Sequence, residues 1–493
     1  MHKDSVHSRP PTVADAFPPA HDMAGAGGAH AQRTREAKPI GHLHPVLIAL
    51  AVILVTALLT HLVPAGSFLR EHGHVVPGTY QSIEKDGGLS AVFALRVPHA
   101  GESPAHAATL ISTLAAVPAG FVAQAPLIVM LMFAGAVFGV LRATGAIDAA
   151  IDDLLHVSAG NASLLVAGVL ILIACGATFL GFGSEYVAIV PLVLSLTTRL
   201  KLPNLIAAAI VVLGMDIGYI ASVTNPNVLA VAQPLAGVPI FSGIGPRLGI
   251  FVAMAIVALG YVMFYLRRLP AADCTPAARR LTTAQIRVLI TLVAGAAALV
   301  AGTSLWSWKH ESEAAAFFTL SVMLALAGGL RWSAAADALL DGMRNMTLPV
   351  AMIGLGGSVG HLLVSSQIQD TIVRDLAILI QGQPHATVAA GLMAVEMAFG
   401  VLIHSVSAKA AISIPILAPI AHLSGVSGQV TVTALLLGSG LINMVSPTNG
   451  LLLAFLSSAG VSYVAWIRFV APLFAVLCLV GFAALYLVTT LGI

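Results

Sequence analysis

Long apolar runs separated by short polar segments dominate the pattern of this chain. Two clear runs are 44–63 (HPVLIALAVILVTALLTHLV) and 247–266 (RLGIFVAMAIVALGYVMFYL). A helix of about 20 apolar residues is long enough to cross a bilayer. Of the 493 residues, 58% are hydrophobic and 9% are charged, whereas an ordinary soluble domain has roughly 25% charged residues. The pattern therefore predicts an all-α, polytopic membrane protein.

The positions of lysine and arginine predict how the spans are oriented. These residues gather before the first span and in later connections, and they favour the cytoplasmic side. We therefore expect a bacterial inner-membrane protein with a cytoplasmic N-terminus and an external loop over 64–122. On the same basis, 163–200 forms a re-entrant hairpin from the cytoplasmic face and 386–421 a second hairpin from the external face. The basic residues that fix this path include Arg35, Lys38, Arg142, Arg199, Lys201, Arg267, Arg268, Arg331 and Arg344.

The chain divides into four parts by composition and internal similarity. Residues 1–41 are rich in Pro, Ala, Gly and His and lack the apolar core of a signal peptide, which predicts a disordered cytoplasmic tail. A first repeat then occupies 42–268. A linker with one extra span occupies 269–313, and a second repeat occupies 314–493.

A polar interruption inside an apolar run occurs twice, and it defines the repeat. Residues 221–227 read ASVTNPN and residues 446–449 read SPTN, and Ser446 follows Ser222 by 446 − 222 = 224 positions. At the same offset Pro191 matches Pro415. Short amphipathic segments, 146–155 and 368–377, precede each hairpin. The predicted orientation runs the two copies in opposite directions through the membrane.

Broken helices in both halves of an inverted repeat are typical of transporter binding sites. Proline, serine, threonine and asparagine weaken a helix interior, and irregular backbone at membrane depth is tolerated only where it is buried in protein or lines a water-filled cavity. The predicted broken helices are 203–233 and 428–456. Their candidate binding residues are Ser222, Thr224, Asn225, Ser446, Thr448 and Asn449.

The two hairpin tips supply the second half of the predicted site. Small and hydroxyl-bearing residues there allow tight turns and offer oxygen ligands to a hard cation such as Na⁺. A Na⁺ ion held by a hairpin tip and the adjoining broken helix is therefore a candidate coupling ion. The tip residues are Gly183, Ser184 and Glu185 in the first copy and His404, Ser405, Ser407 and Lys409 in the second.

Charged and titratable residues in the apolar segments are candidates for function because burying them in a membrane is costly. Lys409 can pair with a substrate carboxylate or occupy the place of a coupling cation, and it can equally form a structural pair with Glu396. Glu185 can bind a cation, a proton or a substrate amine, or it can form a structural ion pair. Asp216 and His404 are candidates for proton coupling, although a histidine in a packed helix is often only hydrogen-bonded.

These motifs resemble the YfcC-like transporters, which are related to the DcuC-type anaerobic C4-dicarboxylate carriers of the ion transporter superfamily. The resemblance runs from about His42 to the end. It is carried by the stretches THLVPAGSF, VVPGTY, GSEYVAIVP to FSGIGPR, SAKAAISIPILAP and INMVSPTNG.

The resemblance implies an elevator mechanism, in which hairpins and broken helices move against a fixed scaffold, and a homodimer. It also implies that Gly183 and Ser184 cluster with 222–225, and that Ser405 and Ser407 cluster with 446–449. The sodium-coupled dicarboxylate branch carries Ser-Asn-Thr at the hairpin tips. This chain has GFG at 181–183 and SVS at 405–407, which weakens the case for sodium coupling and dicarboxylate specificity.

The first functional prediction is a secondary transporter of small organic anions such as C4-dicarboxylates, by cation symport or exchange. The alternative is a transporter of amino acids or other zwitterions, for which Glu185 and Lys409 offer opposite charges. A channel and an intramembrane enzyme are weaker alternatives. HExxH does not occur in the chain, and the GxSxG match at 356–360 (GGSVG) lies within a predicted membrane span, where its glycines favour helix packing. We expect no cofactor. The expected partners are a small-molecule substrate and the lipid bilayer, with no nucleic acid.

Overall fold

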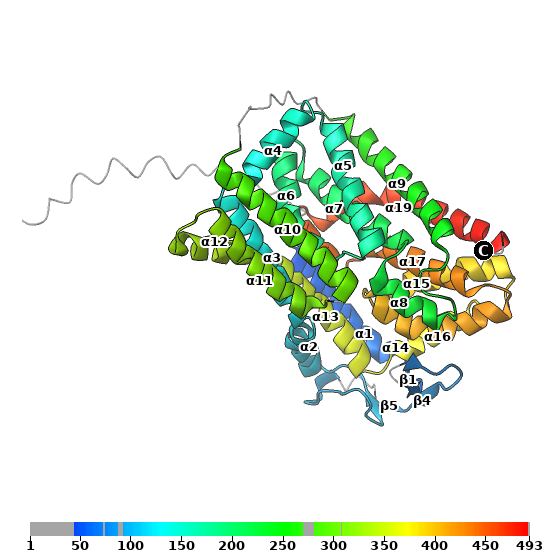
Figure 1. Ribbon diagram of the computed structural model, residues 1–493. Helices are drawn as coiled ribbons and strands as arrows, with labels where there is room; N and C mark the ends of the chain where they lie inside the picture. Colours follow the sequence, from blue (N-terminus) through cyan, green and yellow to red (C-terminus); the bar gives the residue numbers. More distant parts are fainter. Residues whose placement is uncertain (1–43, 72–73, 87–91, 270–280, 307, 492–493) are drawn as a thin grey trace, which may run out of the picture. The chain divides into compact units, whose positions relative to one another are not determined.

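The computed structural model describes residues 44–71, 74–86, 92–269, 281–306 and 308–491. The predicted tail, 1–41, lies outside these residues. Within them, nine helices are long and apolar enough to cross a membrane. The chain is thus a multi-pass, predominantly helical membrane protein, as the apolar runs predict (Figure 1).

The first half of the helical region contains nine helices and one π-helical turn. The first helix begins after His44, whose side chain accepts the Val46 N–H, and α2 begins with a capping box made by Thr109 and Ser112. The elements are α1 (Pro45–Leu62), α2 (Leu110–Ala123), α3 (Ala125–Ala143), α4 (Ala146–Val157), α5 (Ala162–Cys175), η3 (Gly176–Leu180), α6 (Tyr186–Arg199), α7 (Asn204–Ala221), α8 (Pro226–Leu235) and α9 (Ile244–Leu266).

The second half repeats this order after one additional helix, α10 (Thr283–Trp306). Each predicted hairpin is a pair of helices joined by a short loop, and each predicted broken helix is two helices separated by a few residues. The elements are α11 (His310–Ala327), α12 (Trp332–Asn345), α13 (Thr347–Ser365), α14 (Gln369–Ile378), α15 (His385–Gly400), α16 (Val406–Leu423), α17 (Gly428–Asn443), α18 (Gly450–Ala459) and α19 (Tyr463–Thr490).

The packing of the helices repeats in the same way as their order. Helix α2 packs on α13 while α12 packs on α3, and α1 packs on α13 while α11 packs on α3. In the other part of the unit, α5 and α6 contact α7 as α15 and α16 contact α17, and α8 contacts α16 as α18 contacts α6. Helices α1–α3 and α5–α8 therefore correspond in their packing to α11–α13 and α15–α18.

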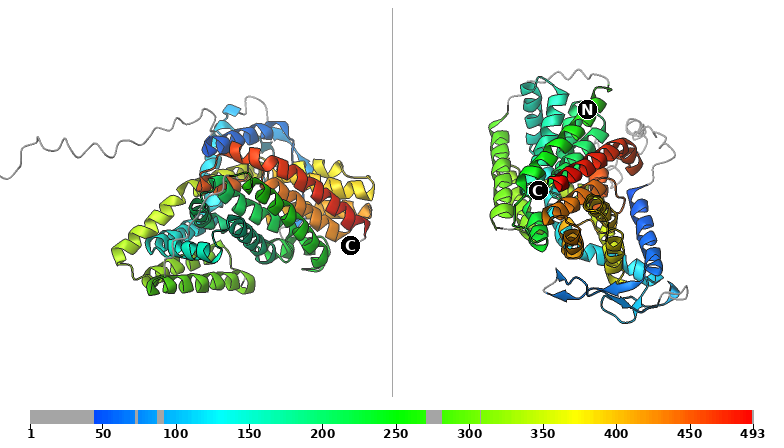
Figure 2. Two further views of the ribbon diagram at one scale, coloured as in Figure 1. Left: turned by 90° about the horizontal axis from the view of Figure 1, so that it is seen from above. Right: turned by 90° about the vertical axis from the view of Figure 1, so that its right-hand side faces the viewer.

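The predicted external loop, 64–122, is more structured than the sequence indicates. Six short strands occupy its first part, and its last part belongs to α2. Strand β1 (Ala65–Ser67) pairs antiparallel with β4 (Gln81–Ile83). Likewise β2 (Arg70–Glu71) pairs antiparallel with β3 (His74–Val75), and β5 (Lys85–Asp86) pairs in parallel with β6 (Ala105–His106). The strands gather at one end of the helical unit, beyond the end of α1 (Figures 1 and 2). The all-α prediction is therefore incomplete for this loop, because strands this short carry no detectable periodicity.

A second difference concerns α12, which the sequence analysis assigns to a connection. Its sequence, WSAAADALLDGMRN, is too short and too polar for a membrane span, yet it forms a helix that packs along α3. Gly342 of α12 meets the backbone of Gly135 in α3 so closely that an added Cβ would lie 2.2 Å from the Gly135 carbonyl oxygen. Small residues at such a crossing allow two helix backbones to approach each other.

Candidate functional site

A cavity of about 600 Å³ lies where the loops between the paired helices meet the two helix breaks. It is lined by the loop between η3 and α6, the loop between α15 and α16, the first turns of α8 and α18, and the start of α11. The predicted site residues that line it are Gly183, Ser184, Glu185, Asp216, His404, Ser405, Ser407 and Asn449. The structure thus brings residues of both repeats to one place.

The first helix break is held open by hydrogen bonds to η3 and to the loop that follows it. Ser222 ends α7 in the left-handed conformation at φ 40°, and the Val223 N–H donates to Thr178 Oγ1 at 3.0 Å. The Thr224 hydroxyl donates to the Phe179 carbonyl at 3.1 Å. Asn225 then starts α8, since its side chain accepts the Asn227 N–H at 3.0 Å. Ser222, Thr224 and Asn225 therefore support the cavity wall without lining it.

The second helix break repeats this arrangement with different partners. Asn449 starts α18 by accepting the Leu451 N–H at 3.0 Å, and its Nδ2 donates to the Asn443 carbonyl at 3.0 Å. Thr448 Oγ1 lies 2.7 Å from His404 Nε2 and in contact with Ser446 Oγ. Ser446 and Thr448 thus connect this break to the α15–α16 loop, and His404 is hydrogen-bonded within it.

One contact joins the two repeats directly at the cavity. The Ser407 hydroxyl, in the first turn of α16, donates to the Asn227 carbonyl in the first turn of α8 at 2.6 Å. Ser405 starts α16 as its N-cap and accepts the Ala408 N–H at 3.4 Å. The first turns of α8, α16 and α18 all line the cavity. Helix N-termini present free N–H groups and partial positive charge, so these three ends suit an anionic group.

Three carboxylate side chains line the same cavity, and they come from three different elements. Asp216 lies on α7, is 1% exposed, and has no hydrogen-bond partner for either carboxylate oxygen among the described residues. Glu185 lies just before α6, and its Oε2 accepts the Gly183 N–H at 2.6 Å. Glu313 lies on the first turn of α11 and is 4% exposed. Carboxylates withdrawn from water favour a cationic partner.

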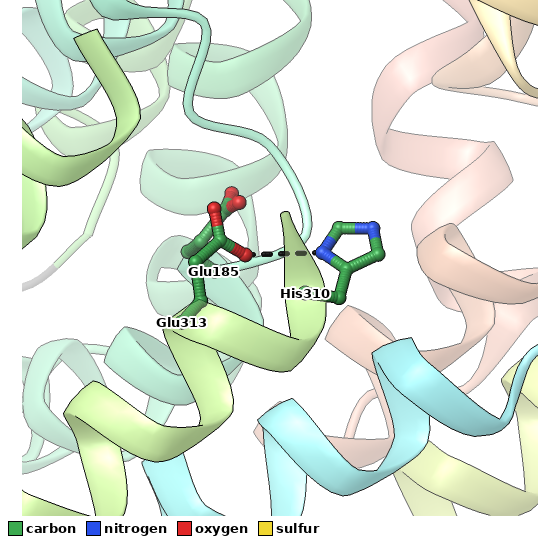
Figure 3. A group of neighbouring side chains, drawn as sticks. All are labelled: Glu185, His310 and Glu313. Atoms are coloured by element: carbon green, nitrogen blue, oxygen red, sulfur yellow. Dashed lines mark hydrogen bonds and ion pairs between the residues drawn. The ribbon is translucent and has the colours of Figure 1, made fainter. Parts of the chain in front are cut away.

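Glu185, His310 and Glu313 form a compact group at one side of the cavity. The His310 Nδ1 atom lies 3.0 Å from Glu313 Oε2. One ligand atom from each of the three residues lies within 4.8 Å of the other two. Figure 3 shows the three side chains converging, with Glu185 carried by the loop before α6 and the other two carried by α11. The group therefore brings together two elements that lie far apart in the sequence.

His310 and Glu313 are not among the predicted site residues, and both lie at the end of the predicted linker, 269–313. The residues HESE at 310–313 lie just before the adjoining apolar run, where charged residues normally flank a membrane helix. A signal was nonetheless present, since two charged residues one helical turn apart share a helix face. Lys309 and Trp308 also line the cavity, and Lys309 is exposed.

Lys409 does not line the cavity. Its Nζ donates to the Glu396 carbonyl oxygen at 2.8 Å and lies 3.5 Å from Glu396 Oε2, with both side chains 1% exposed. Of the alternatives left open by the sequence, the geometry matches the structural pair with Glu396. The expected pairing of Glu185 and Lys409 as opposite charges facing one substrate therefore does not fit, because Lys409 is committed to another residue.

The chain is similar in sequence to a known family and to two bacterial relatives. The family described as C4-dicarboxylate anaerobic carrier (DcuC) matches residues 44–490. The Escherichia coli (strain K12) protein named "Putative basic amino acid antiporter YfcC" is 27% identical over 473 residues, covering 88% of this chain and 93% of its own. An uncharacterized Haemophilus influenzae protein is 24% identical over 426 residues, covering 82% and 80%.

Solved structures of two bacterial transporters are also similar. The Alcanivorax borkumensis YdaH transporter is 17% identical, with 91% of this chain and 99% of that chain covered and a TM-score of 0.43. The Neisseria gonorrhoeae MtrF structure, described as one of a class of antimetabolite efflux pumps, is 17% identical, with 91% and 95% covered and a TM-score of 0.42.

Proposed function

Since this chain belongs to the DcuC family of C4-dicarboxylate anaerobic carriers, we propose that it is a secondary transporter whose cavity carries an amino acid, with basic amino acids as the first candidates. The family assignment confirms the resemblance found in the sequence, and it favours transport over intramembrane catalysis. The choice of substrate class rests on the cavity itself.

The observation that carries the proposal is the separation of charge in the cavity. Glu185, Asp216 and Glu313 present three carboxylates, while the first turns of α8, α16 and α18 present helix N-termini. An amino acid can place its α-carboxylate at the helix N-termini and its ammonium or guanidinium group at the carboxylates. A C4-dicarboxylate would bring two further negative charges to the same three side chains. The name of the E. coli relative supports the same substrate class.

A dicarboxylate remains the second candidate because of the family description. Lys309 and His310 also line the cavity, and either could face one carboxylate of such a substrate. His310 is already paired with Glu313 at 3.0 Å, and Lys309 is exposed. The local balance of charge therefore favours the amino acid.

For the transport movement we propose an elevator mechanism in the predicted inverted-repeat arrangement, with the N-terminus in the cytoplasm. Support comes from the packing, which groups the helices into two sets. Helices α1–α3 and α11–α13 contact one another and form the first set. Helices α5–α9 and α15–α19 form the second set. In this proposal the first set is the scaffold. The α5–α6 and α15–α16 pairs are then the re-entrant hairpins that move with the broken helices, and the coupling ion is a proton or Na⁺.

The test is exchange transport in proteoliposomes loaded with unlabelled arginine, lysine or succinate and supplied with each labelled compound. We expect saturable exchange of arginine or lysine, and we expect that added succinate does not inhibit it. Glu185→Gln should reduce this exchange about tenfold or more, since hydrogen bonds to charged groups contribute about 1.5–3 kcal/mol. Asp341→Asn is the matched control, because Asp341 is an exposed carboxylate on α12, paired with Arg344 at 2.7 Å. Exchange of succinate, without exchange of arginine or lysine, would overturn the amino acid proposal and identify the substrate as a dicarboxylate.

A further inference from the structure

We propose that Glu185, His310 and Glu313 form a binding site for a divalent transition-metal ion of the Zn²⁺ type, which joins the loop before α6 to the start of α11. The ligand set supports this class of ion. Two carboxylates and one imidazole are common zinc ligands, and three protein ligands leave one position open. Mg²⁺ and Ca²⁺ fit less well, because they prefer six or more oxygen ligands and no imidazole.

The distances in the group are compatible with a single ion. Zinc lies about 2.0–2.2 Å from nitrogen and oxygen ligands, so two ligand atoms of a tetrahedral site are about 3.4 Å apart. His310 Nδ1 and Glu313 Oε2 are 3.0 Å apart, and the three ligand atoms are all within 4.8 Å of one another. Side-chain rotations that move an atom by about an ångström would close this geometry around an ion.

The surroundings of the group also favour a bound cation. Glu185 already has one oxygen fixed by the Gly183 N–H, which orients the carboxylate in the way that outer hydrogen bonds orient metal ligands. Glu313 is 4% exposed, and among the described residues its side chain pairs with His310. A separate observation comes from Asp216, which is 1% exposed, has both carboxylate oxygens without a hydrogen-bond partner among the described residues, and faces the same cavity. The cavity therefore holds more buried carboxyl groups than its described neighbours pair.

A metal ion at this place would affect movement as well as charge. Glu185 belongs to the α5–α6 pair and the other two ligands belong to α11, which packs on α3. An ion bound to all three residues would tie these elements together, and it would lie at the wall of the cavity that the substrate needs, because all three residues line that cavity. We therefore expect Zn²⁺ to inhibit transport in competition with substrate. This consequence rests on the proposed function, whereas metal binding itself does not.

The direct test is metal titration of the full-length protein, purified with a removable tag and stripped with a chelator. Co²⁺ and Zn²⁺ binding are measured by calorimetry, and Co²⁺ ligation by its visible absorption. The histidines of the N-terminal tail contribute the same background in every variant. We expect Glu185→Gln, His310→Asn and Glu313→Gln each to lose one high-affinity ion per chain, or to bind it at least about tenfold more weakly.

The matched control is His99→Asn. His99 and Glu102 form the same i,i+3 pair at 3.3 Å, but they lie in the external loop with side chains 73% and 28% exposed. This variant should keep the high-affinity ion. Glu185→Asp and Glu313→Asp retain a carboxylate and should still bind the ion, although more weakly. If high-affinity binding is lost only in Glu185→Gln and Glu313→Gln, the carboxylates are metal ligands and the loss is not due to misfolding. Equal binding by the wild type and all three ligand variants would overturn the proposed site, whatever substrate is transported.

Measuring the inhibition of exchange by Zn²⁺ distinguishes the proposed metal site from the proposed substrate. If arginine or lysine exchange is observed, micromolar Zn²⁺ should slow it in the wild type and in His99→Asn, but not in His310→Asn. Metal binding without any amino acid exchange would uphold the metal site and reject the substrate proposal. Amino acid exchange that is insensitive to Zn²⁺, in protein that binds no high-affinity ion, would uphold the substrate proposal and reject the metal site.

Discussion

Lys409 and Glu396 form an ion pair that is almost completely withdrawn from solvent. The Lys409 Nζ atom lies 3.5 Å from Glu396 Oε2 and donates to the Glu396 carbonyl at 2.8 Å, with each side chain 1% exposed. The two residues lie on opposite sides of the α15–α16 loop, Glu396 on α15 and Lys409 on α16. The pair therefore connects α15 and α16, the two helices on either side of the loop that lines the cavity.

Breaking this pair should destabilise the protein more than it impairs substrate recognition. Lys409→Met leaves the Glu396 carboxylate buried without a cation, which typically costs about 3–5 kcal/mol. The double variant Lys409→Met, Glu396→Leu removes both charges and should recover most of that loss. Thermal unfolding in detergent, followed by the monodisperse fraction after heating, measures the effect. A stable Lys409→Met with lost transport would instead point to a direct role in binding substrate.

Gly181 provides a second test, because its lack of a side chain is required by the first helix break. It has φ +80°, and an added Cβ would lie 2.5 Å from Asn225 Oδ1, the atom that starts α8. Gly181→Ala should therefore strain the loop by about 1–3 kcal/mol and greatly reduce exchange transport.

Gly168→Ala is the control for this substitution. Gly168 lies on α5 in the same hairpin, and an added Cβ would meet nothing within 4 Å. Alanine is also the better helix former, so this variant should be as stable as the wild type or slightly more so. Equal transport by Gly181→Ala and Gly168→Ala would show that the contact between the loop and the helix break is not needed.

The helix breaks could be predicted from sequence because their polar residues interrupt strongly apolar runs. Asn225 and Asn449 occupy matching positions in the two copies, and each starts the second part of its helix by accepting a backbone N–H. The family assignment was predictable for the same reason, since the matching stretches surround these breaks. Local chemistry of this kind depends on neighbours in the chain, which the sequence shows directly.

The completed cavity could not be predicted, because its remaining members come together only through tertiary packing. Glu313 and His310 reach Glu185 because α11 packs on α3, and nothing in the residues 310–313 specifies that neighbour. The partner of Lys409 was equally open, since the sequence alone permits a substrate, a coupling ion or Glu396. Only the path of the chain around the α15–α16 loop distinguishes these alternatives.

Lys85 should make the stability of the strand-containing segment between α1 and α2 depend on pH. Its Nζ donates to the Val63 carbonyl at 2.7 Å and to the Thr60 carbonyl, at the end of α1, and burial lowers its pKa from 10.5 to about 8. A lysine whose pKa is lower in the folded state binds fewer protons there than in the unfolded state. Stability should therefore rise with pH between about 8 and 10.5, and it should be lowest below pH 8.

The measurement for Lys85 is the unfolding temperature of the wild type and two variants between pH 7 and pH 10. The wild type should gain stability relative to Lys85→Met as the pH rises. Lys85→Arg should show no such gain, because a guanidinium stays charged throughout this range. Parallel curves for the wild type and Lys85→Arg would contradict the lowered pKa.

Asp216 offers the clearest separation of stability from function. Both of its carboxylate oxygens lack a hydrogen-bond partner among the described residues, although the side chain is 1% exposed. Leaving a buried polar group unpaired costs about 1–3 kcal/mol. Asp216→Leu should therefore raise the unfolding temperature while abolishing exchange transport, and Asp216→Asn should lose transport with little change in stability.

Glu396→Leu is the appropriate comparison for Asp216→Leu, because it removes an equally buried carboxylate that has a cationic partner, the Lys409 ammonium 3.5 Å away. That substitution leaves Lys409 unpaired and should lower the unfolding temperature. The two leucine variants are thus expected to change stability in opposite directions, although each replaces a carboxylate that is 1% exposed. This contrast follows only if Asp216 lacks a partner until substrate or a coupling cation enters the cavity. An Asp216→Leu protein that is less stable than the wild type, and still exchanges substrate, would show that Asp216 has a structural partner instead.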